Sequence, residues 1–395
     1  MSAKFNFDAP IDRNGTCCIK WDRRMGKFQE PDVLPLWIAD TDFACPPEVN
    51  EAIINRCSHP IYGYSFASDT YYSSIIDWFQ NRHRLTIDRS WMRTASGAVT
   101  SVSYSIQALT EPGDQVLIQT PVYDPFQVVT EGTGRRLVES PLIFRDNSYV
   151  MDYEDLERRF RDGVRLMVLC NPHNPVGRVW SERELERLAE LCVKYHVYLI
   201  SDELHCDFAL FGNRYTSILS IPEIHPLAVC CIAPGKTFNI SGLAVATTLI
   251  PNPELDQKVF AKLRSAWLIN PNLLGLEASA AAYAHGGEWA DAQVRYIEEN
   301  SRFVQKQLGE EAPHIVPARH EGTFLMWLNF RDFGLSNEAL ENELVHTWHL
   351  GMNGGWHFGP GGDGFMRLNI GCTRKTLSEA VDRLVQMHRA HFPSK

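Results

Sequence analysis

The 395-residue sequence has no long apolar run, no long basic run and no clustered cysteine motif. No stretch approaches the ~20 apolar residues that a membrane-spanning helix needs, and the first 15 residues lack the apolar core of a signal peptide. A net charge of −10 without a basic run argues against nucleic acid or an anionic membrane as the main partner. We therefore expect a cytoplasmic protein with neither a membrane nor a nucleic-acid partner.

The ten cysteines contain no CxxC pair and form no compact group with histidines. In a chain of this length without a secretion signal, such cysteines are typical of reduced, mostly buried thiols rather than of disulfides or a zinc site. We therefore predict no metal centre.

What the chain does contain is ordinary for a globular protein, with 44% hydrophobic and 22% charged residues. Its length predicts a large domain and a smaller one. Strand-like and helix-like segments alternate from about residue 94 to residue 250, which favours an α/β fold with a mostly parallel central sheet flanked by helices. Four short apolar runs predict neighbouring strands of this sheet, at residues 116–119, 166–170, 197–200 and 228–232.

The pattern changes beyond about residue 287. A second, α+β domain is predicted by a long polar helix, two strand-like segments and a closing helix, the first three at about residues 289–308, 323–330 and 365–370. The segment before Pro46 has few periodic signals and is expected to pack with that domain or across a subunit boundary. We therefore predict a large domain over residues 47–286, and a small domain formed by residues 287–395 with the N-terminal segment 1–46.

Four chemically suitable side chains follow the four apolar runs, namely Tyr123, Asn174, Asp202 and Lys236. If the runs are parallel neighbours, these side chains gather beyond the carboxyl ends of the strands, where open α/β sheets bind their ligands. Pyridoxal 5′-phosphate is held by a lysine, and it withdraws electrons only when a carboxylate keeps its ring nitrogen protonated. The sequence therefore predicts a site for this cofactor.

Lys236 and Asp202 are the residues on which this interpretation mainly depends. A surface position is the commonest one for a lysine, but Lys236 follows an apolar strand and precedes the mostly small and apolar segment TFNISGL. Nearby positive charge would lower its pKa and make it a competent base. The alternative for Asp202 is a cap on the following helix, whereas pairing with a pyridinium would offset the cost of burying its carboxylate.

Three other candidate residues each have a second, purely structural interpretation. Asn174 could donate to the phenolic oxygen of the cofactor, although Asn-Pro is also ordinary turn chemistry. His205, one helical turn past Asp202, could share that role, but a lone histidine is more often structural. Tyr123 could stack on the pyridine ring or be a tyrosine of the core.

Two further features suit the anionic ends of a cofactor and a substrate. Gly97 and Ala98 begin a predicted helix whose exposed N–H groups and dipole suit a phosphate, although a glycine before a helix is by itself a weak signal. Arg367 lies in the alternating strand-like segment FMRLN. Facing inward, it would bind an amino-acid carboxylate in bidentate fashion; otherwise it would form a surface salt bridge.

At these residues the chain resembles fold-type-I pyridoxal-phosphate enzymes, which have an aspartate-aminotransferase-like fold, and among them the cystalysin/MalY/PatB group of cysteine-S-conjugate β-lyases. The resemblance covers nearly the whole chain. It rests on the motifs PLWIADTDFACPPEV (35–49), YGY (62–64), QTPVYDPF (119–126), NPHNPVGRVW (171–180), SDELHCDF (201–208), APGKTFNISGL (233–243), EGTFLMWLNF (321–330) and FMRLNIGCTR (365–374). WIADTDF and NPHNPVGRVW point to the lyase group rather than to aminotransferases in general.

The resemblance implies a role for each candidate residue. The implied catalytic residues are Lys236, Asp202 and Tyr123. The implied cofactor ligands are Gly97, Ala98, Tyr123, Asn174, Asp202, His205 and Lys236, with Tyr62 reaching the phosphate region from the neighbouring subunit of a homodimer. The implied substrate-binding residues are Arg367, Tyr64 and Ala39.

One departure from the family pattern concerns the residue before the lysine. Family members usually carry a serine there, whose hydroxyl contacts the phosphate, and this chain has Gly235. Losing that hydrogen bond would weaken cofactor binding by ~1–3 kcal/mol unless another group replaces it, and Thr100 is the candidate that we expect. The segments SGL (241–243) and YSFASDTYY (64–72) also differ, near the expected substrate entrance.

The implied activity is the α,β-elimination of L-cystathionine or a related cysteine S-conjugate to pyruvate, ammonia and a thiol. An aminotransferase acting on an amino acid stays open as an alternative, because it would use the same residues. A lyase-like protein with an additional regulatory role is a further alternative.

Overall fold

The computed structural model describes residues 5–393 and contains two main β-sheets. The larger sheet has the strand order β2-β10-β9-β8-β7-β3-β4. Neighbours from β9 to β4 are parallel, and β10 is antiparallel to both of its neighbours. These strands are β2 (Met92–Ala95), β3 (Gln115–Ile118), β4 (Arg136–Glu139), β7 (Val164–Cys170), β8 (Tyr198–Asp202), β9 (Ala228–Ile232) and β10 (Ala246–Leu249). The predicted α/β fold with a mostly parallel sheet is confirmed, and the four apolar runs are β3, β7, β8 and β9.

Helices cover both faces of this sheet, which explains why its strands are continuously apolar. Alternate residues of one strand enter different cores, so Leu166 and Val168 of β7 pack on one face while Met167 and Leu169 pack on the other. The first face is covered by α5 (Ala98–Leu109), α6 (Pro125–Gly132) and α9 (Pro253–Ser265). The second is covered by α4 (Asp69–His83), α7 (Tyr153–Arg161), α8 (Glu182–Tyr195) and α10 (Leu273–His285).

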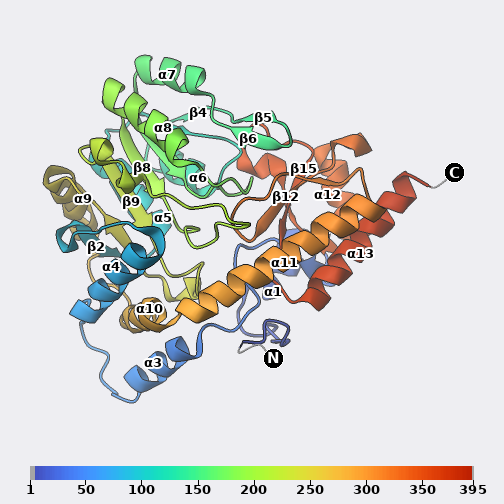
Figure 1. Ribbon diagram of the computed structural model, residues 1–395, viewed down its shortest axis with the longest axis horizontal. Helices are drawn as coiled ribbons and strands as arrows, with labels where there is room; N and C mark the ends of the chain where they lie inside the picture. Colours follow the sequence, from blue (N-terminus) through green and yellow to red (C-terminus); the bar gives the residue numbers. More distant parts are fainter. Residues whose placement is uncertain (1–4, 394–395) are drawn as a thin grey trace.

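The smaller sheet is antiparallel and lies in the C-terminal part of the chain. Its strands, in spatial order, are β11 (Val316–Pro317), β12 (Leu325–Asn329), β15 (Phe365–Asn369) and β14 (Asn353–Gly354). It lies beside α11 (Gly287–Glu311), α12 (Asn337–His346) and α13 (Arg374–His391), and Figure 1 shows α11 and α13 running along one side of this part. The predicted polar helix lies within α11, and the two predicted strands are β12 and β15.

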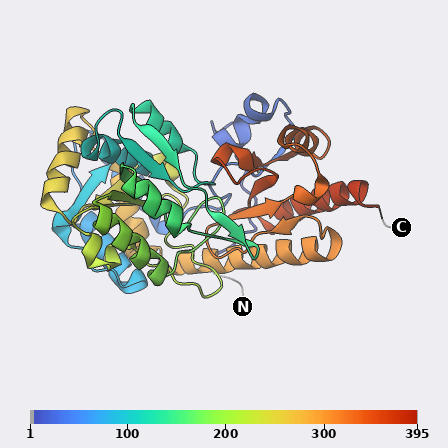
Figure 2. The same cartoon turned by 90° about the horizontal axis from the view of Figure 1, so that it is seen from above.

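The N-terminal segment lies against the C-terminal part of the chain (Figure 2). Its strand β1 (Leu34–Pro35) pairs in parallel with β13 (Leu350–Gly351). The remaining α-helices and strands are α1 (Ile19–Asp22), α2 (Arg24–Phe28), α3 (Pro47–Cys57) and the hairpin of β5 (Ile143–Arg145) with β6 (Ser148–Val150). The division into domains at residues 47–286 stays a prediction.

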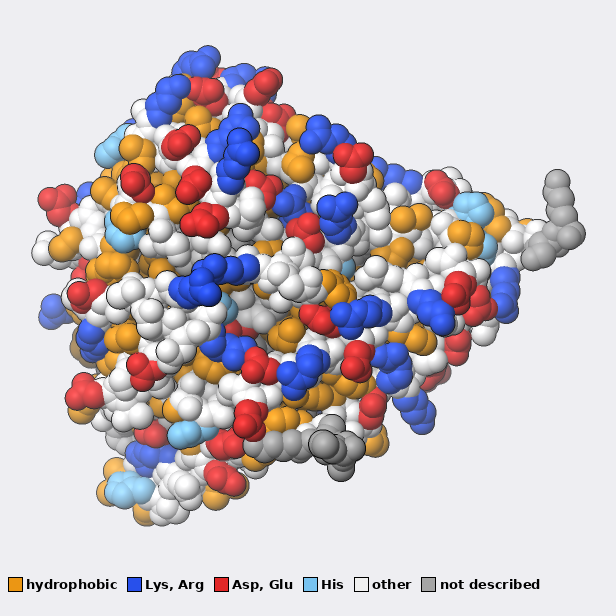
Figure 3. Space-filling view, in the orientation of Figure 1, with side chains coloured by type: hydrophobic (Ala, Val, Ile, Leu, Met, Phe, Trp, Pro, Cys, Tyr) orange, Lys and Arg blue, Asp and Glu red, His pale blue; other side chains and the backbone are white. Residues whose placement is uncertain are grey.

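The surface in Figure 3 carries basic and acidic side chains interspersed with one another. Within residues 5–393, none of the helices combines the length and the apolar character needed to cross a bilayer.

Candidate active site

A cavity of about 320 Å³ lies beyond the carboxyl ends of β7, β8 and β9. Most of the residues predicted for the site line it, namely Ala39, Gly97, Ala98, Tyr123, Asn174, Asp202, His205 and Lys236. Arg367 lies beside it and bonds to one of its walls. The parallel order of three neighbouring strands is what brings these residues together, as expected for an open α/β sheet.

Lys236 lies in the tight turn that follows β9, where the N–H of Phe238 donates to the carbonyl of Pro234 at 2.9 Å. Its Nζ donates to the carbonyl of Ala39 at 2.6 Å. The pKa of Lys236 is lowered to about 8, chiefly by burial and also by the charge of Arg367, while Asp40 and Asp202 oppose the shift. A lysine with this pKa can lose its proton near neutral pH and act as a base.

Asp202 ends β8 and is buried, with 6% of its surface exposed. Its Oδ1 accepts a hydrogen bond from the N–H of Leu204 at 3.2 Å. Burial raises the pKa of Asp202 to about 6, although this hydrogen bond and the charge of Lys236 act in the opposite direction. A cationic group bound in the cavity would stabilise the ionised form of this carboxylate.

Arg367 is held by two acceptors at the edge of the cavity. Its Nη1 donates to Asn174 Oδ1 at 3.1 Å, and its Nη2 donates to the carbonyl of Trp37 at 2.6 Å. Its Nε is buried and has no hydrogen-bond partner within residues 5–393. Because the amide oxygen of Asn174 is occupied by Arg367, its N–H groups are left for another acceptor.

The N-terminus of α5 faces the cavity with residues 96–100. Gly97 precedes the helix with φ +118, a value that residues with a side chain rarely adopt, and as a glycine it has no side chain to cap the first turn. The N–H groups of this turn therefore lack intrahelical partners, and together with the helix dipole they suit an anion such as a phosphate.

Gly235 and Ser241 both line the cavity. A Cβ added to Gly235 would lie 2.8 Å from Ser241 Oγ and 3.0 Å from Ser241 Cα, so a serine at position 235 does not fit beside Ser241 in this backbone. Thr100, the replacement expected for the missing hydroxyl, lines the same cavity, and Ser241 offers a second hydroxyl there.

His205 and Tyr123 are uncharged walls of the cavity. Burial, together with the charges of Lys236 and Arg367, lowers the pKa of His205 to about 3, and its buried Nδ1 has no partner in the described part of the chain. Burial and the nearby carboxylates of Asp202 and Asp124 raise the pKa of Tyr123 to about 12. Both side chains are therefore neutral at physiological pH.

Tyr62 and Tyr64 lie outside the cavity of this single chain. They are 61% and 96% exposed, and the hydroxyl of Tyr62 donates to the carbonyl of Cys57 at 3.2 Å. A role for either residue requires a second subunit, so both assignments stay predictions.

Comparison with known proteins places this geometry in a family. Residues 31–384 match the sequence pattern of the family described as aminotransferase class I and II. The chain belongs to this family. It is 39% identical to cystathionine β-lyase PatB of Bacillus subtilis over 96% of this chain and 98% of that protein. It is 32% identical to the protein MalY of Escherichia coli over 98% and 99% of the two chains.

Comparison with a solved structure gives a consistent result. Cystalysin of Treponema denticola, whose structure contains pyridoxal 5′-phosphate, superimposes with a TM-score of 0.93 at 31% identity. The match covers 97% of this chain and 98% of cystalysin. The predicted resemblance to the cystalysin/MalY/PatB group of this family is therefore confirmed.

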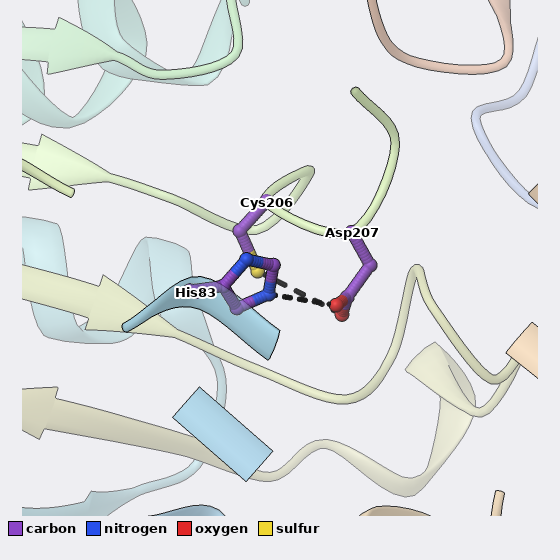
Figure 4. Close-up of side chains that lie close together, drawn as sticks. All are labelled: His83, Cys206 and Asp207. Atoms are coloured by element: carbon purple, nitrogen blue, oxygen red, sulfur yellow. Dashed lines mark hydrogen bonds and ion pairs between the residues drawn. The ribbon is translucent and has the colours of Figure 1, made fainter. Parts of the chain in front are cut away.

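One polar cluster beside the site was missed from the sequence (Figure 4). Asp207 accepts hydrogen bonds from His83 at 2.9 Å, from Trp78 at 3.1 Å and from Thr237, the residue after Lys236, at 2.6 Å. Burial opposes the charge of Asp207, but His83, Arg82 and Thr237 keep its pKa below the ordinary value. His83, Cys206 and Asp207 are residue types that can bind a metal ion, and they lie close together. The carboxylate of Asp207, however, already accepts hydrogen bonds from His83, Trp78 and Thr237, and through Thr237 it anchors the turn that carries Lys236.

Asp207 and Thr237 belong to the motifs SDELHCDF and APGKTFN, on which the family resemblance partly rests. The cluster itself could not be predicted, because the histidine that completes it lies 124 residues away from Asp207 along the chain.

Proposed function

We propose that this protein is a pyridoxal-phosphate-dependent carbon–sulfur β-lyase that converts L-cystathionine or a related cysteine S-conjugate to pyruvate, ammonia and a thiol. The observation that carries the proposal is the single cavity in which Lys236, Asp202 and the N-terminus of α5 face the same space. The names of PatB and of further relatives, among them a cystathionine β-lyase of Corynebacterium glutamicum, favour this reaction over transamination.

The donor set of the cavity fits the cofactor. The free N–H groups at the start of α5 suit its phosphate, Asp202 suits its ring nitrogen, and the amide N–H groups of Asn174 suit its phenolic oxygen. When bound, pyridoxal phosphate withdraws electrons from the Cα of an amino acid through its protonated ring. Tyr123 offers its ring as a stacking surface, and His205 contributes a neutral wall.

Lys236 performs two tasks in this proposal. It would hold the cofactor covalently, and its free amine would take the proton from the substrate Cα. A pKa of about 8 suits both tasks, since the free amine is accessible near neutral pH. Breaking the Cβ–S bond then releases the sulfur with the bonding electrons as a thiolate, and hydrolysis of the remaining three-carbon fragment gives pyruvate and ammonia.

Arg367 binds the α-carboxylate of the substrate. It lies at the cavity edge, it is buried, and one of its donors has no partner among residues 5–393. Burial lowers its pKa to about 10, so it keeps its positive charge at neutral pH. Arg367 and Lys236 bond to the same segment, at Trp37 and Ala39, so a carboxylate bound by Arg367 would lie near the Lys236 end of the cavity.

A homodimer is part of the proposal, with Tyr62 and Tyr64 reaching the site of the partner subunit. The support is a group of strongly exposed apolar side chains in and after α3, formed by Ile54, Ile61, Tyr62, Tyr64 and Phe66. Such a group is typical of a protein–protein interface. We also propose a large cofactor-binding domain over residues 47–286 and a small domain formed by residues 1–46 and 287–395, and a cytoplasmic location.

The purified protein with added pyridoxal phosphate is expected to release equal amounts of pyruvate and thiol from L-cystathionine without any 2-oxo acid. The measurement is a pyruvate assay and a free-thiol assay on the same samples. Lys236→Ala is the control for product that does not come from this site. Product formation that depends strictly on a 2-oxo acid would contradict the lyase and favour the aminotransferase alternative.

Replacing Arg367 with alanine is expected to raise the KM for L-cystathionine at least about tenfold, because a charge-assisted hydrogen bond to the carboxylate is lost. Steady-state kinetics on the holoenzyme measure this change. Arg93→Ala is a matched control, since Arg93 is a partly buried arginine paired with Asp256 and does not line the cavity. An unchanged KM would remove Arg367 from the carboxylate site.

A further inference from the structure

The segment of residues 37–43, called here the strap, contacts both charged side chains that the proposed reaction needs. The carbonyl of Trp37 accepts a hydrogen bond from Arg367 Nη2, and the carbonyl of Ala39 accepts one from Lys236 Nζ, both at 2.6 Å. The strap backbone is therefore one of the supports that set the positions of these two side chains.

Two asparagines hold the strap backbone from the side of the site. Asn369 Nδ2 donates to the carbonyls of Ile38 and Asp40, both at 2.6 Å. Asn239, three residues after Lys236, donates to the carbonyls of Thr41 and Phe43 at 3.0 and 2.7 Å. The strap is thus tied to the strand that carries Arg367 and to the turn that carries Lys236.

Lys20 of α1 also holds the strap, and its side chain is completely buried. Its Nζ donates to Asp42 Oδ2 at 3.0 Å and to the carbonyl of Asp40 at 3.3 Å. Its own carbonyl accepts a hydrogen bond from Trp37 Nε1 at 3.1 Å. One residue therefore fixes the strap at positions 37, 40 and 42.

Arg13 completes a cluster of four charges. It forms ion pairs with Asp40 and Asp42, both at 2.7 Å. Burial alone would lower the pKa of Lys20, but the two aspartates raise it above its ordinary value, so Lys20 stays charged. A buried charge cluster stabilises a fold less than apolar packing does. Its benefit here is that it holds the strap in one conformation.

We infer that Lys20 is a positioning residue that fixes the strap so that Arg367 is pre-oriented for the carboxylate of an amino-acid substrate. Lys20 is not among the residues that line the cavity, and it acts on Arg367 through the carbonyl of Trp37. Pre-orientation improves carboxylate binding because the guanidinium does not have to be ordered when the ligand arrives. The inference rests on the proposed role of Arg367 in carboxylate binding.

The test compares how the holoenzyme binds L-alanine and L-alaninamide, which differ in the carboxylate. Binding is followed by the visible absorbance of the bound cofactor and does not require turnover. The wild-type protein is expected to prefer L-alanine by about tenfold or more. In Lys20→Met this preference should fall severalfold, because the carboxylate-binding arginine is no longer held in place.

Asp42→Asn makes a smaller change to the same cluster and carries the test if Lys20→Met does not fold. The double variant Lys20→Met/Asp42→Asn removes one charge of each sign, so it leaves no unpaired buried charge. Any effect that it keeps is due to the loss of the Lys20 anchor and not to a charge imbalance. Its preference for L-alanine should remain reduced even where its melting temperature recovers. Asp256→Asn, which disrupts an ion pair away from the cavity, should keep the wild-type preference.

Two results would overturn the inference, and they differ in what else they affect. Variants that melt at lower temperature but keep the wild-type preference would make Lys20 a structural residue only, with the role of Arg367 intact. A wild-type protein without any preference for L-alanine would remove the carboxylate-binding role of Arg367 and the inference with it.

Discussion

Lys236→Ala is expected to lower kcat/KM for L-cystathionine by about 10³-fold or more, because it removes both the covalent attachment of the cofactor and the base at Cα. The visible absorption of the lysine-bound cofactor should disappear in the same variant. Assays of pyruvate release and an absorption spectrum of the protein incubated with pyridoxal phosphate measure the two effects.

The matched control is Lys194→Ala, which removes an exposed lysine that pairs with Glu157 on the surface. It should leave both the activity and the absorption unchanged. Melting temperatures show whether each variant is folded. A Lys236→Ala variant that is folded and nearly as active as the wild type would refute the central assignment of the site.

The sheet and the charged centre of the site could be predicted because their signals are local. β7 and β9 are buried along nearly their whole length, so each one appears in the sequence as a short unbroken apolar run. In a parallel sheet the residue after such a run lies at the ligand-binding edge. Asp202 and Lys236 could therefore be placed in one site without knowledge of any contact between them.

The parts that could not be predicted depend on contacts between distant segments. Arg367 bonds to Asn174 across 193 residues of the chain, and no spacing in the sequence encodes that distance. Lys20 is more instructive, since lysine is almost never fully buried without a partner. Its partners, Asp40 and Asp42, belong to a motif that supports the family resemblance, but only the fold brings them to Lys20.

Asp202→Asn is expected to have opposite effects on activity and on the stability of the cofactor-free protein. Activity should fall at least about 10²-fold, because the variant cannot keep the ring nitrogen of the cofactor protonated. Stability without cofactor should rise near neutral pH. Pyruvate assays measure the first effect, and urea unfolding of the cofactor-free proteins measures the second.

The stability effect follows from the pKa of Asp202. Folding raises this pKa from the ordinary value of 3.8 to about 6, so the folded protein binds the proton more tightly than the unfolded chain. The wild type therefore loses stability as the pH rises from about 4 to 6, and above that range the loss is constant at roughly 2–3 kcal/mol. Asparagine does not ionise, so the variant should exceed the wild type at pH 7.5 by an amount that vanishes at low pH.

Asp207→Asn provides a control of opposite sign, because folding lowers the pKa of Asp207 through His83, Arg82 and Thr237. Its ionised carboxylate stabilises the folded protein above the unfolded-state pKa, and this stabilisation is lost as the pH falls through the folded-state pKa. Asp207→Asn should therefore destabilise the protein at pH 7.5. Bound cofactor should make the wild type more stable than Asp202→Asn, since it places a further cation beside this carboxylate. Stability curves for the cofactor-free wild type and Asp202→Asn that stay parallel from pH 4 to pH 7.5 would contradict the assignment.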